Sequence, residues 1–254
     1  MIFDTHMHTE FSTDSEMKIE DAIKVAKEKD LGIIITEHYD LDYPVGNDFK
    51  CDIPSYFKAY EKYRSDKVLL GIEIGLASST LSANEQTVKD NRFDYVLGSI
   101  HGVDQIDIFT DYIYMGLDEK TFYDRYFEYM IKCIKMYDGF DSLGHIDYIH
   151  RYAPFEKPEL RVGEYKEALA EVMKVLIDKN KAIELNTRRF GSEASRKALL
   201  EVYRLYKDLG GKYVTIGSDA HGIDAIGAYF DEGLKMVKEL GLKAVYFERR
   251  EMKY

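Results

Sequence analysis

The sequence predicts an α/β fold of one domain, in which parallel strands form a barrel-like sheet. Short apolar runs alternate with longer segments of helical periodicity about seven times along the chain, which is typical of parallel strands joined by helical crossovers. Residues 1–254 contain no linker, low-complexity tract or sequence repeat, and 45% hydrophobic residues suffice for a sizeable core. A doubly wound open sheet has the same alternation, so the strand count alone does not separate the two architectures.

Seven apolar runs have the length of buried strands. They are Ile2–Thr5, Gly32–Thr36, Val68–Ile74, Tyr95–Ile100, Ser142–His145, Ala182–Asn186 and Tyr213–Gly217, and an eighth run, Ala244–Phe247, is expected at an edge. Segments of helical period lie between them: Ile19–Glu28, Ser55–Tyr63, Glu119–Met136, Val162–Lys179, Ala194–Leu209 and Glu232–Leu240. Asp14 and Ser15 before the first helix, and Gly210 and Gly211 after the fifth, are typical start and stop signals.

The net charge of the chain limits which kinds of molecule it is expected to bind. Lys and Arg total 35 and Asp and Glu total 46, which gives a net charge of −11. An acidic chain without a clustered basic run is not expected to bind nucleic acid through its phosphates. A small phosphorylated substrate is still compatible, because bound metal ions reverse the charge locally. The sequence leaves the oligomeric state open.

The apolar runs and the cysteines indicate in which cellular compartment the protein is expected. No run approaches the roughly 18 residues of a membrane span, and Asp4 and His6 interrupt the start, where the apolar part of a signal peptide would lie. Cys51 and Cys133 are too few for a disulfide framework and too isolated for a cysteine-type zinc site. We therefore expect reduced thiols in a cytoplasmic protein that does not bind a membrane.

Six of the seven histidines lie at the carboxyl end of a predicted strand. In a parallel barrel these ends meet at one rim, where active sites are built. The side chains expected there are His6, His8, Glu37, His38, Glu73, His101, His145, Asp219 and His221. Imidazole combined with carboxylate suits zinc, manganese or iron, so the pattern predicts a metal site. His150 falls beyond a strand end and is expected to be an ordinary loop or helix residue.

Seven segments carry a resemblance to a known family. They are DTHMHTEFSTDS at 4–15, ITEH at 35–38, GIEIG at 71–75, GSIHGVD at 98–104, GHIDYIHRY at 144–152, ELNT at 184–187 and GSDAHGIDAIG at 217–227. With these motifs in this order, the chain resembles the polymerase-and-histidinol-phosphatase (PHP) superfamily, and most closely its histidinol-phosphatase branch. The resemblance covers nearly the whole chain and implies a distorted (β/α)7 barrel, similar to a TIM barrel, with a trinuclear metal centre.

The same resemblance implies which side chains bind each metal ion. The first ion would be held by His6, His8, Glu73 and Asp219. Glu73 would bridge to a second ion held by His101 and His145, and a third ion would be held by His38, His221 and Asp14. Many members of the superfamily have a histidine where Asp14 stands, and an aspartate here is similar to the histidinol-phosphatase branch.

A centre of two or three divalent ions suits hydrolysis at phosphorus. Metals a few ångströms apart lower the pKa of a bridging water and clamp the phosphoryl oxygens, so no serine or cysteine nucleophile is needed. Three divalent ions would bring a charge of +6 and the ligands Asp14, Glu73 and Asp219 would return −3, so the centre would attract a phosphomonoester dianion. The proton for the leaving alkoxide would come from metal-bound water or from Asp14, and the sequence does not choose between them.

Arginine is the expected second group that holds the phosphate, because its fork matches two phosphate oxygens. Arg151 follows the fifth predicted strand, and Arg188 and Arg189 follow the sixth. The resemblance also implies arginines near these positions. Which of Arg188 and Arg189 would bind phosphate is left open by the sequence.

These features favour a phosphomonoesterase that hydrolyses L-histidinol phosphate to L-histidinol and phosphate in histidine biosynthesis. Loop acids such as Asp40, Asp42 and Asp104, together with 21 tyrosines, offer too many candidates for the amino-imidazole end. Three alternatives remain. One is a PHP phosphoesterase of other specificity, such as a nucleotide phosphatase or a nuclease. Another is an amidohydrolase, in which a lysine is expected to bridge the metals, whereas the bridging candidate here is Glu73. The third is a catalytically silent metal-binding module, against which the complete ligand set argues.

Overall fold

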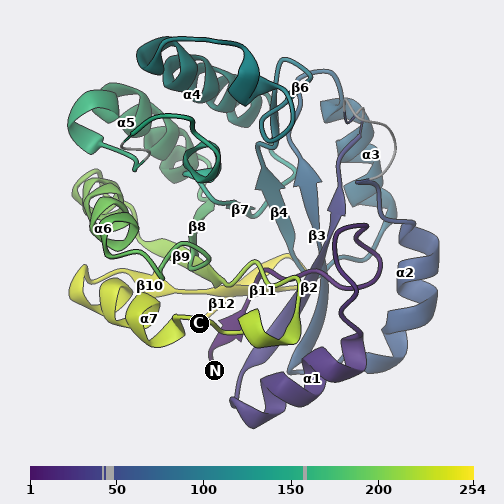
Figure 1. Ribbon diagram of the computed structural model, residues 1–254. Helices are drawn as coiled ribbons and strands as arrows, with labels where there is room; N and C mark the ends of the chain where they lie inside the picture. The colour runs from purple at the N-terminus through teal and green to yellow at the C-terminus, as the bar shows by residue number, and fades with distance from the viewer. Residues whose placement is uncertain (42, 44–48, 157–158) are drawn as a thin grey trace.

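The structure is a computed structural model that describes residues 1–41, 43, 49–156 and 159–254. Its centre is a curled sheet of eight parallel strands in the order β1-β2-β3-β4-β7-β8-β9-β10 (Figure 1). The strands are β1 (Phe3–Asp4), β2 (Gly32–Tyr39), β3 (Val68–Gly75), β4 (Val96–Ser99), β7 (Ser142–Leu143), β8 (Ala182–Asn186), β9 (Tyr213–Gly217) and β10 (Lys243–Ala244). Neighbours in the sheet are therefore also successive parallel strands of the chain, as the alternating pattern predicts.

In the described residues, seven α-helices accompany the sheet. They are α1 (Ile19–Glu28), α2 (Ile53–Tyr60), α3 (Leu81–Asp90), α4 (Glu119–Met136), α5 (Val162–Asp178), α6 (Glu193–Asp208) and α7 (Phe230–Glu239). Three of them begin at side-chain caps. Asp52 accepts a hydrogen bond from the N–H of Ser55 (3.5 Å), Asp118 from the N–H of Thr121 (3.0 Å) and Ser192 from the N–H of Ser195 (3.3 Å). No helix in the described ranges is long and apolar enough to cross a membrane.

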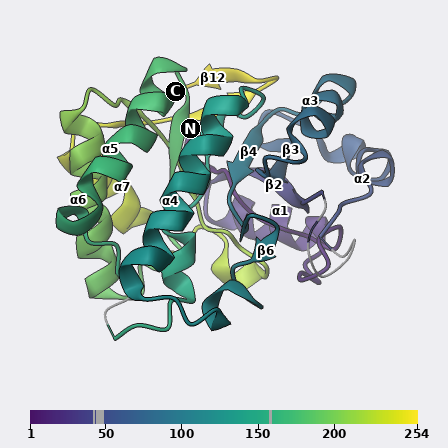
Figure 2. The ribbon, with the colours of Figure 1, turned by 90° about the horizontal axis from the view of Figure 1, so that it is seen from above.

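The helices follow one another around the outside of the curled sheet (Figures 1 and 2). The first strand closes the ring, because its chain pairs with β2 on one side and with the end of β9 on the other. The N–H of Thr5 donates to the carbonyl of Ile216, and the N–H of Asp219 donates to the carbonyl of His6, each at 2.9 Å. β10 pairs with β9 only near the amino end of β9. The prediction of a distorted barrel is therefore confirmed, and the open, doubly wound sheet is excluded.

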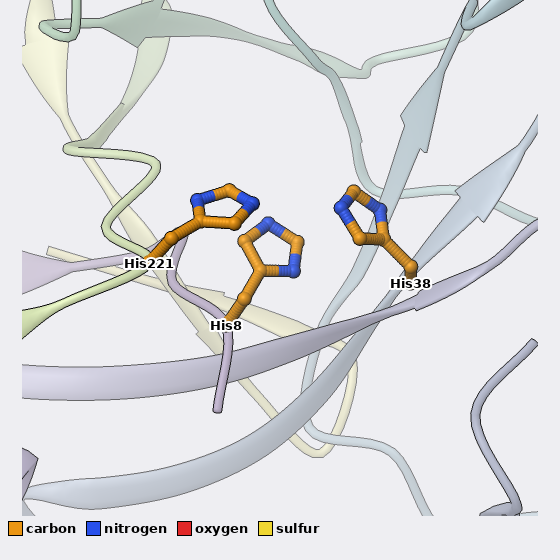
Figure 3. Close-up of side chains that lie close together, drawn as sticks. All are labelled: His8, His38 and His221. Carbon is orange, nitrogen blue, oxygen red and sulfur yellow. The ribbon is translucent and has the colours of Figure 1, made fainter. Parts of the chain in front are cut away.

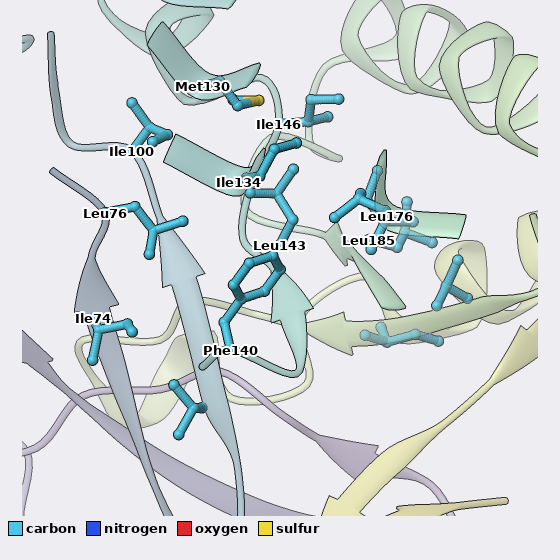
Figure 4. Packing of buried hydrophobic residues seen from close by; sticks show 14 of the residues in the cluster. Ile74, Leu76, Ile100, Met130, Ile134, Phe140, Leu143, Ile146, Leu176 and Leu185 are labelled. Carbon is cyan, nitrogen blue, oxygen red and sulfur yellow. The ribbon is translucent and has the colours of Figure 1, made fainter. Parts of the chain in front are cut away.

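Alternate residues of β2 and β3 enter two different apolar clusters. Ile33, Ile35 and Leu70 belong to the large cluster between the sheet and the helices, part of which is drawn in Figure 4. Ile34 and Leu69 point the other way, into a small cluster inside the barrel. The inner cluster also contains Phe3, Tyr95, Leu97, Ala182, Val245 and Phe247.

The C-terminal hairpin plugs the amino end of the barrel. Its strands are β11 (Tyr246–Glu248) and β12 (Glu251–Lys253). Tyr246 stacks on Phe3 with ring centroids 4.0 Å apart, and Phe247 stacks on Tyr95 at 5.6 Å. With this end filled by apolar side chains, the polar interior lies toward the carboxyl ends of the strands. The plug therefore helps to define the end at which a site can form.

The structure contains elements that the sequence pattern did not reveal. Helix α3 was not expected, because its residues are mostly polar and only Leu81 and Asn84 are buried, which gives little helical periodicity. The expected edge strand Ala244–Phe247 is divided between β10 and β11. A further hairpin, formed by β5 (Gly102–Val103) and β6 (Ile106–Asp107), follows β4. Short 3₁₀-helices cover Glu61–Tyr63, Tyr112–Tyr114, Tyr148–Arg151 and Ile223–Ala225.

Candidate metal centre

The predicted ligands gather at the carboxyl end of the barrel. His38 and Glu73 lie in β2 and β3, His6 and His8 follow β1, Asp14 precedes α1, His101 follows β4, His145 follows β7, and Asp219 and His221 follow β9. All except Asp14 belong to overlapping groups of three whose ligand atoms lie within 4.8 Å of one another. Asp14 lies beside them, with its Oδ2 atom 3.0 Å from Nε2 of His221 and 3.5 Å from Nε2 of His38. The close approach of His8, His38 and His221 is visible in Figure 3.

Glu73 lies at the centre of this cluster and is fully buried. Its Oε1 atom lies 3.0 Å from Nε2 of His145 and 3.3 Å from Nε2 of His101. Its Oε2 atom lies 2.8 Å from Nδ1 of His38 and 3.6 Å from Nε2 of His8. The two oxygens of one carboxylate therefore face different sets of histidines, as a ligand shared by two ions would.

The hydrogen-bond partners of two histidines test whether a cation fits between them. The hydroxyl of Ser12 donates to Oε2 of Glu37 (2.5 Å), so its oxygen accepts the Nδ1 proton of His8 (3.2 Å). Nδ1 of His6 likewise donates to Oε1 of Glu184 (2.6 Å). Burial would lower the pKa of His6, but Glu184 and Glu73 outweigh it and raise this pKa well above its usual value, so without metal Nε2 of His6 donates to Nε2 of His8 across 3.0 Å. Loss of that one proton leaves two Nε2 lone pairs directed at the same position, so these residues fit a divalent metal.

Two buried carboxylates orient ligands from behind. Glu184 binds Nδ1 of His6, and Oδ1 of Asp40 lies 2.8 Å from Nδ1 of His101, so the Nε2 atom of each ring faces the cluster. Such partners are usual for metal-binding histidines, because they set the tautomer and the direction of the ring. The sequence analysis missed this role of both residues. The available signal was a charged residue, Glu184, inside the buried strand Ala182–Asn186.

Glu37 is the third acidic residue at a predicted strand end. Among the described residues it belongs to none of the groups of possible metal ligands, and its role is to hold neighbouring residues in place. It is fully buried and accepts hydrogen bonds from the backbone N–H of Thr9 (3.0 Å) and from Ser12. These contacts fix the loop after β1, and Ser12 in turn holds the ring of His8. Glu37 therefore orients a candidate ligand through one intervening residue.

The turn after β9 depends on a glycine at position 217 and on a left-handed backbone at Asp219. A Cβ atom at Gly217 would lie 2.3 Å from Oε1 of Glu184 and 2.5 Å from Cβ of His6, so only glycine fits there. Asp219 adopts a left-handed backbone with a φ of 55°, a strained conformation that is common at functional sites. The buried carboxylate of Asp4 holds this turn by accepting a hydrogen bond from the N–H of Ser218 (2.9 Å). The turn thereby directs Asp219 into the cluster.

The cluster controls the protonation of its own members. Burial would raise the pKa of Glu73, but the neighbouring His6, His101 and His38 outweigh it and hold this pKa well below its usual range. Burial, and then the charges of His38 and His221, lower the pKa of His8 well below its usual value. For His38, burial is outweighed by Glu73 and Asp14, which raise its pKa to about 9. An ionised carboxylate and a neutral imidazole are the forms that bind metal, whereas His38 must first lose a proton.

A cavity of about 200 Å³ lies above the cluster and is lined by Asp14, His38, His101, His145, Asp219 and His221. Arg151 also lines it, although only 9% of this side chain is exposed. Its Nη1 atom lies 2.7 Å from Oδ2 of Asp219. Within the described residues, its Nε and Nη2 atoms have no hydrogen-bond partner. A buried guanidinium with unused donors is suited to binding an anion in this cavity.

The structure separates the two neighbouring arginines after β8. Arg188 lines the cavity, and its Nη1 atom lies 3.2 Å from both Oδ1 of Asp219 and Nδ1 of His221. Arg189 is not among the residues that line this cavity, and its Nη1 atom lies 3.0 Å from Oδ2 of the buried Asp147. Arg188 is therefore placed to contact a ligand above the cluster, and Arg189 is engaged in an ion pair beside it.

Of the remaining polar candidates, Asp40 is grouped with His38 and His101 as a possible ligand, whereas His150 and Asp104 lie outside the groups of possible ligands in the described residues. His150 is in the 3₁₀-helix Tyr148–Arg151, outside the candidate metal cluster, and its ring stacks on Tyr123 at 4.4 Å. Among the loop acids, Asp40 faces His101 and Asp104 pairs with Arg125 at 3.5 Å. Asp42 lies outside the described residues.

Fold and site together define an α/β barrel with clusters of side chains able to hold metal ions at the carboxyl ends of its strands. The chain belongs to the PHP domain family, which residues 4–188 match. The resemblance found in the sequence is thus confirmed. A probable histidinol-phosphatase of Clostridium acetobutylicum is 48% identical over 254 residues, which are 100% of both chains. The histidinol-phosphatase of Lactococcus lactis is 31% identical over 232 residues, which cover 86% of this chain and 83% of the relative.

Solved structures agree with this assignment. A crystal structure of histidinol phosphate phosphatase from Lactococcus lactis, complexed with zinc, L-histidinol and phosphate, superposes with a TM-score of 0.94 at 27% identity, covering 100% of this chain and 99% of the other. A chain in the cryo-EM structure of archaeal ribonuclease P with mature tRNA has a TM-score of 0.51 at 16% identity, covering 93% and 87%. The second likeness concerns the fold alone.

Proposed function

We propose that this protein is a metal-dependent histidinol-phosphatase, which hydrolyses L-histidinol phosphate to L-histidinol and phosphate in histidine biosynthesis. One observation carries the proposal: a dense cluster of side chains able to hold metal lies beside Arg151, a buried guanidinium with two donors that have no partner among the described residues. The relatives at 48% and 31% identity, both named as histidinol-phosphatases, support the same activity and substrate. The substrate is thus a small phosphorylated molecule rather than a nucleic acid.

The centre would hold two to three ions of zinc, manganese or iron. Their ligands would be His6, His8, Glu73 and Asp219, then His101 and His145 with the shared Glu73, and finally His38, His221 and Asp14. When bound, such ions polarise the phosphoryl oxygens and make a water molecule nucleophilic at neutral pH. The buried free thiols of Cys51 and Cys133 suit a reducing compartment, and we assign the protein to the cytoplasm.

The residues of the chain position the ester. Arg151 and Arg188 would hold the non-bridging phosphoryl oxygens, and both are directed by Asp219, which lies 2.7 Å and 3.2 Å from their Nη1 atoms. Because Asp219 also faces the histidines of the cluster, it ties the phosphate grip to the metal ligands. Arg189 would act indirectly, by pairing with Asp147 next to the 3₁₀-helix that carries Arg151.

Asp14 is better suited to bind metal than to donate a proton. Burial would raise its pKa, but hydrogen bonds to His221 and His38 outweigh burial and hold this pKa well below its usual range. Its carboxyl group is therefore ionised at neutral pH and carries no proton for the leaving alkoxide. We assign it to the candidate third metal site with His38 and His221.

A phosphate-release screen of the metal-loaded protein tests the proposal. The substrates are L-histidinol phosphate, nucleoside monophosphates and short single-stranded DNA, and we expect kcat/KM to be highest for L-histidinol phosphate. A preference for nucleotides would refute the substrate assignment. Release from none of these substrates by protein with a full metal content would refute the phosphatase activity itself.

A further inference from the structure

An aromatic row lines the cavity and is not required for holding metal or phosphate. Tyr148 lies at its base, with its ring centroid 4.8 Å from that of His145 and 5.2 Å from the guanidinium of Arg151. Tyr152 follows at 5.3 Å from Tyr148, and Phe109 follows at 4.8 Å from Tyr152. All three aromatic side chains line the cavity of about 200 Å³. The row therefore runs from His145 of the metal cluster along the wall of the cavity.

Phe109 at the end of this row is 53% exposed. A single exposed aromatic residue is not unusual, and Tyr114 in the same segment is 78% exposed without lining this cavity. Phe109 differs because its exposed face belongs to the wall of a cavity beside reactive groups. Apolar surface at such a position is typical of a ligand-binding site.

Charged groups of both signs border the cavity. Arg151 and Arg188 stand beside the metal cluster. Tyr43, which also lines the cavity, donates a hydrogen bond to the buried carboxylate of Asp107. The carboxyl group of Asp107 thus lies close behind the wall. Arginines and a carboxyl group around one cavity fit an ester that carries both a phosphate dianion and a positively charged group.

We infer that Phe109 and Tyr152, with Tyr148 at their base, form the leaving-group subsite and select phosphomonoesters whose alcohol carries a flat, cationic ring. The inference rests on the proposed phosphatase function. A ring stacked on one aromatic side chain gains roughly threefold to tenfold in binding, from either ring stacking or cation–π attraction. The subsite would distinguish a ring-bearing alcohol from a plain amino alcohol, whereas the metals and arginines treat the phosphate of both alike.

Two esters that differ only in the ring test this subsite. L-Histidinol phosphate is compared with L-alaninol phosphate, which keeps the amino alcohol and replaces the imidazole by hydrogen. In the metal-loaded full chain, Phe109→Ala and Tyr152→Ala should each reduce the ratio of the two kcat/KM values by about threefold to tenfold. Tyr152→Phe keeps the ring and should preserve the ratio. Tyr114→Ala, a matched exposed aromatic outside the cavity, should leave both kcat/KM values unchanged.

Binding of L-histidinol provides a readout that does not depend on turnover. Its dissociation constant, measured by calorimetry, should rise by the same factor in Phe109→Ala and Tyr152→Ala, with metal content equal to that of the wild type. If the wild type hydrolyses both esters with equal kcat/KM, or if the two alanine variants keep the wild-type ratio, the subsite is refuted and the phosphatase function stands. A wild type that hydrolyses neither ester overturns the function and the subsite together.

Discussion

Replacing Arg151 by alanine tests most directly whether this arginine binds the phosphoryl group of the substrate. The Nε and Nη2 atoms of Arg151 are buried without partners in the described residues, while Nη1 is held by Asp219 at 2.7 Å. Two parallel donors on one guanidinium match two phosphate oxygens. A charge-assisted hydrogen bond contributes about 1.5–3 kcal/mol, and about 1.4 kcal/mol corresponds to a factor of ten. We therefore expect KM for L-histidinol phosphate to rise by about tenfold to a hundredfold.

The assay is steady-state phosphate release, supported by the inhibition constant of inorganic phosphate, which should rise in parallel. Arg151→Lys should recover part of the loss, because lysine keeps the charge but not the two-pronged geometry. Arg189→Ala is the matched control, because Arg189 pairs with Asp147 and does not line the cavity. Its KM should change much less. Wild-type KM and phosphate inhibition in a folded, metal-loaded Arg151→Ala variant would show that the metals alone hold the phosphate.

Three further outcomes are expected. Elemental analysis of protein purified without chelator should find two to three transition-metal ions per chain, and a metal content near zero after reconstitution would refute the site. Metal uptake at pH 7 should release protons, because His38, whose pKa is about 9, must deprotonate to bind. Glu73→Gln should lower kcat by roughly a hundredfold or more and reduce the metal content, because one carboxylate faces two groups of ligands; near wild-type values for both would place the bridge elsewhere. Phe247→Ala should lower the free energy of unfolding by about 3–5 kcal/mol, because Phe247 is buried in the plug against Tyr95; an unchanged denaturant midpoint would show that the plug is dispensable.

The sequence alone predicted the α/β class and the types of side chain that gather at the carboxyl ends of the strands. Its alternation of apolar runs and helical segments reports local periodicity, which survives in β2, β3, β8 and most of the helices. Histidines placed directly after apolar runs predicted a cluster at the rim, because the carboxyl ends of all parallel strands meet at one end of a barrel. Helix α3 was not predicted, because a mostly polar helix has little periodicity in its apolar residues.

Tertiary structure decided what depends on side-chain direction and on contacts between distant segments. Arg188 and Arg189 are neighbours in sequence, yet one lines the cavity and the other pairs with Asp147, because a turn sends successive side chains in different directions. The role of Glu184 depends on His6, which is 178 residues away in the chain. Closure between β1 and β9 likewise joins segments that no local pattern connects. Periodicity encodes which face a residue occupies within its own element, whereas the partner across the barrel is set only when the whole sheet has curled.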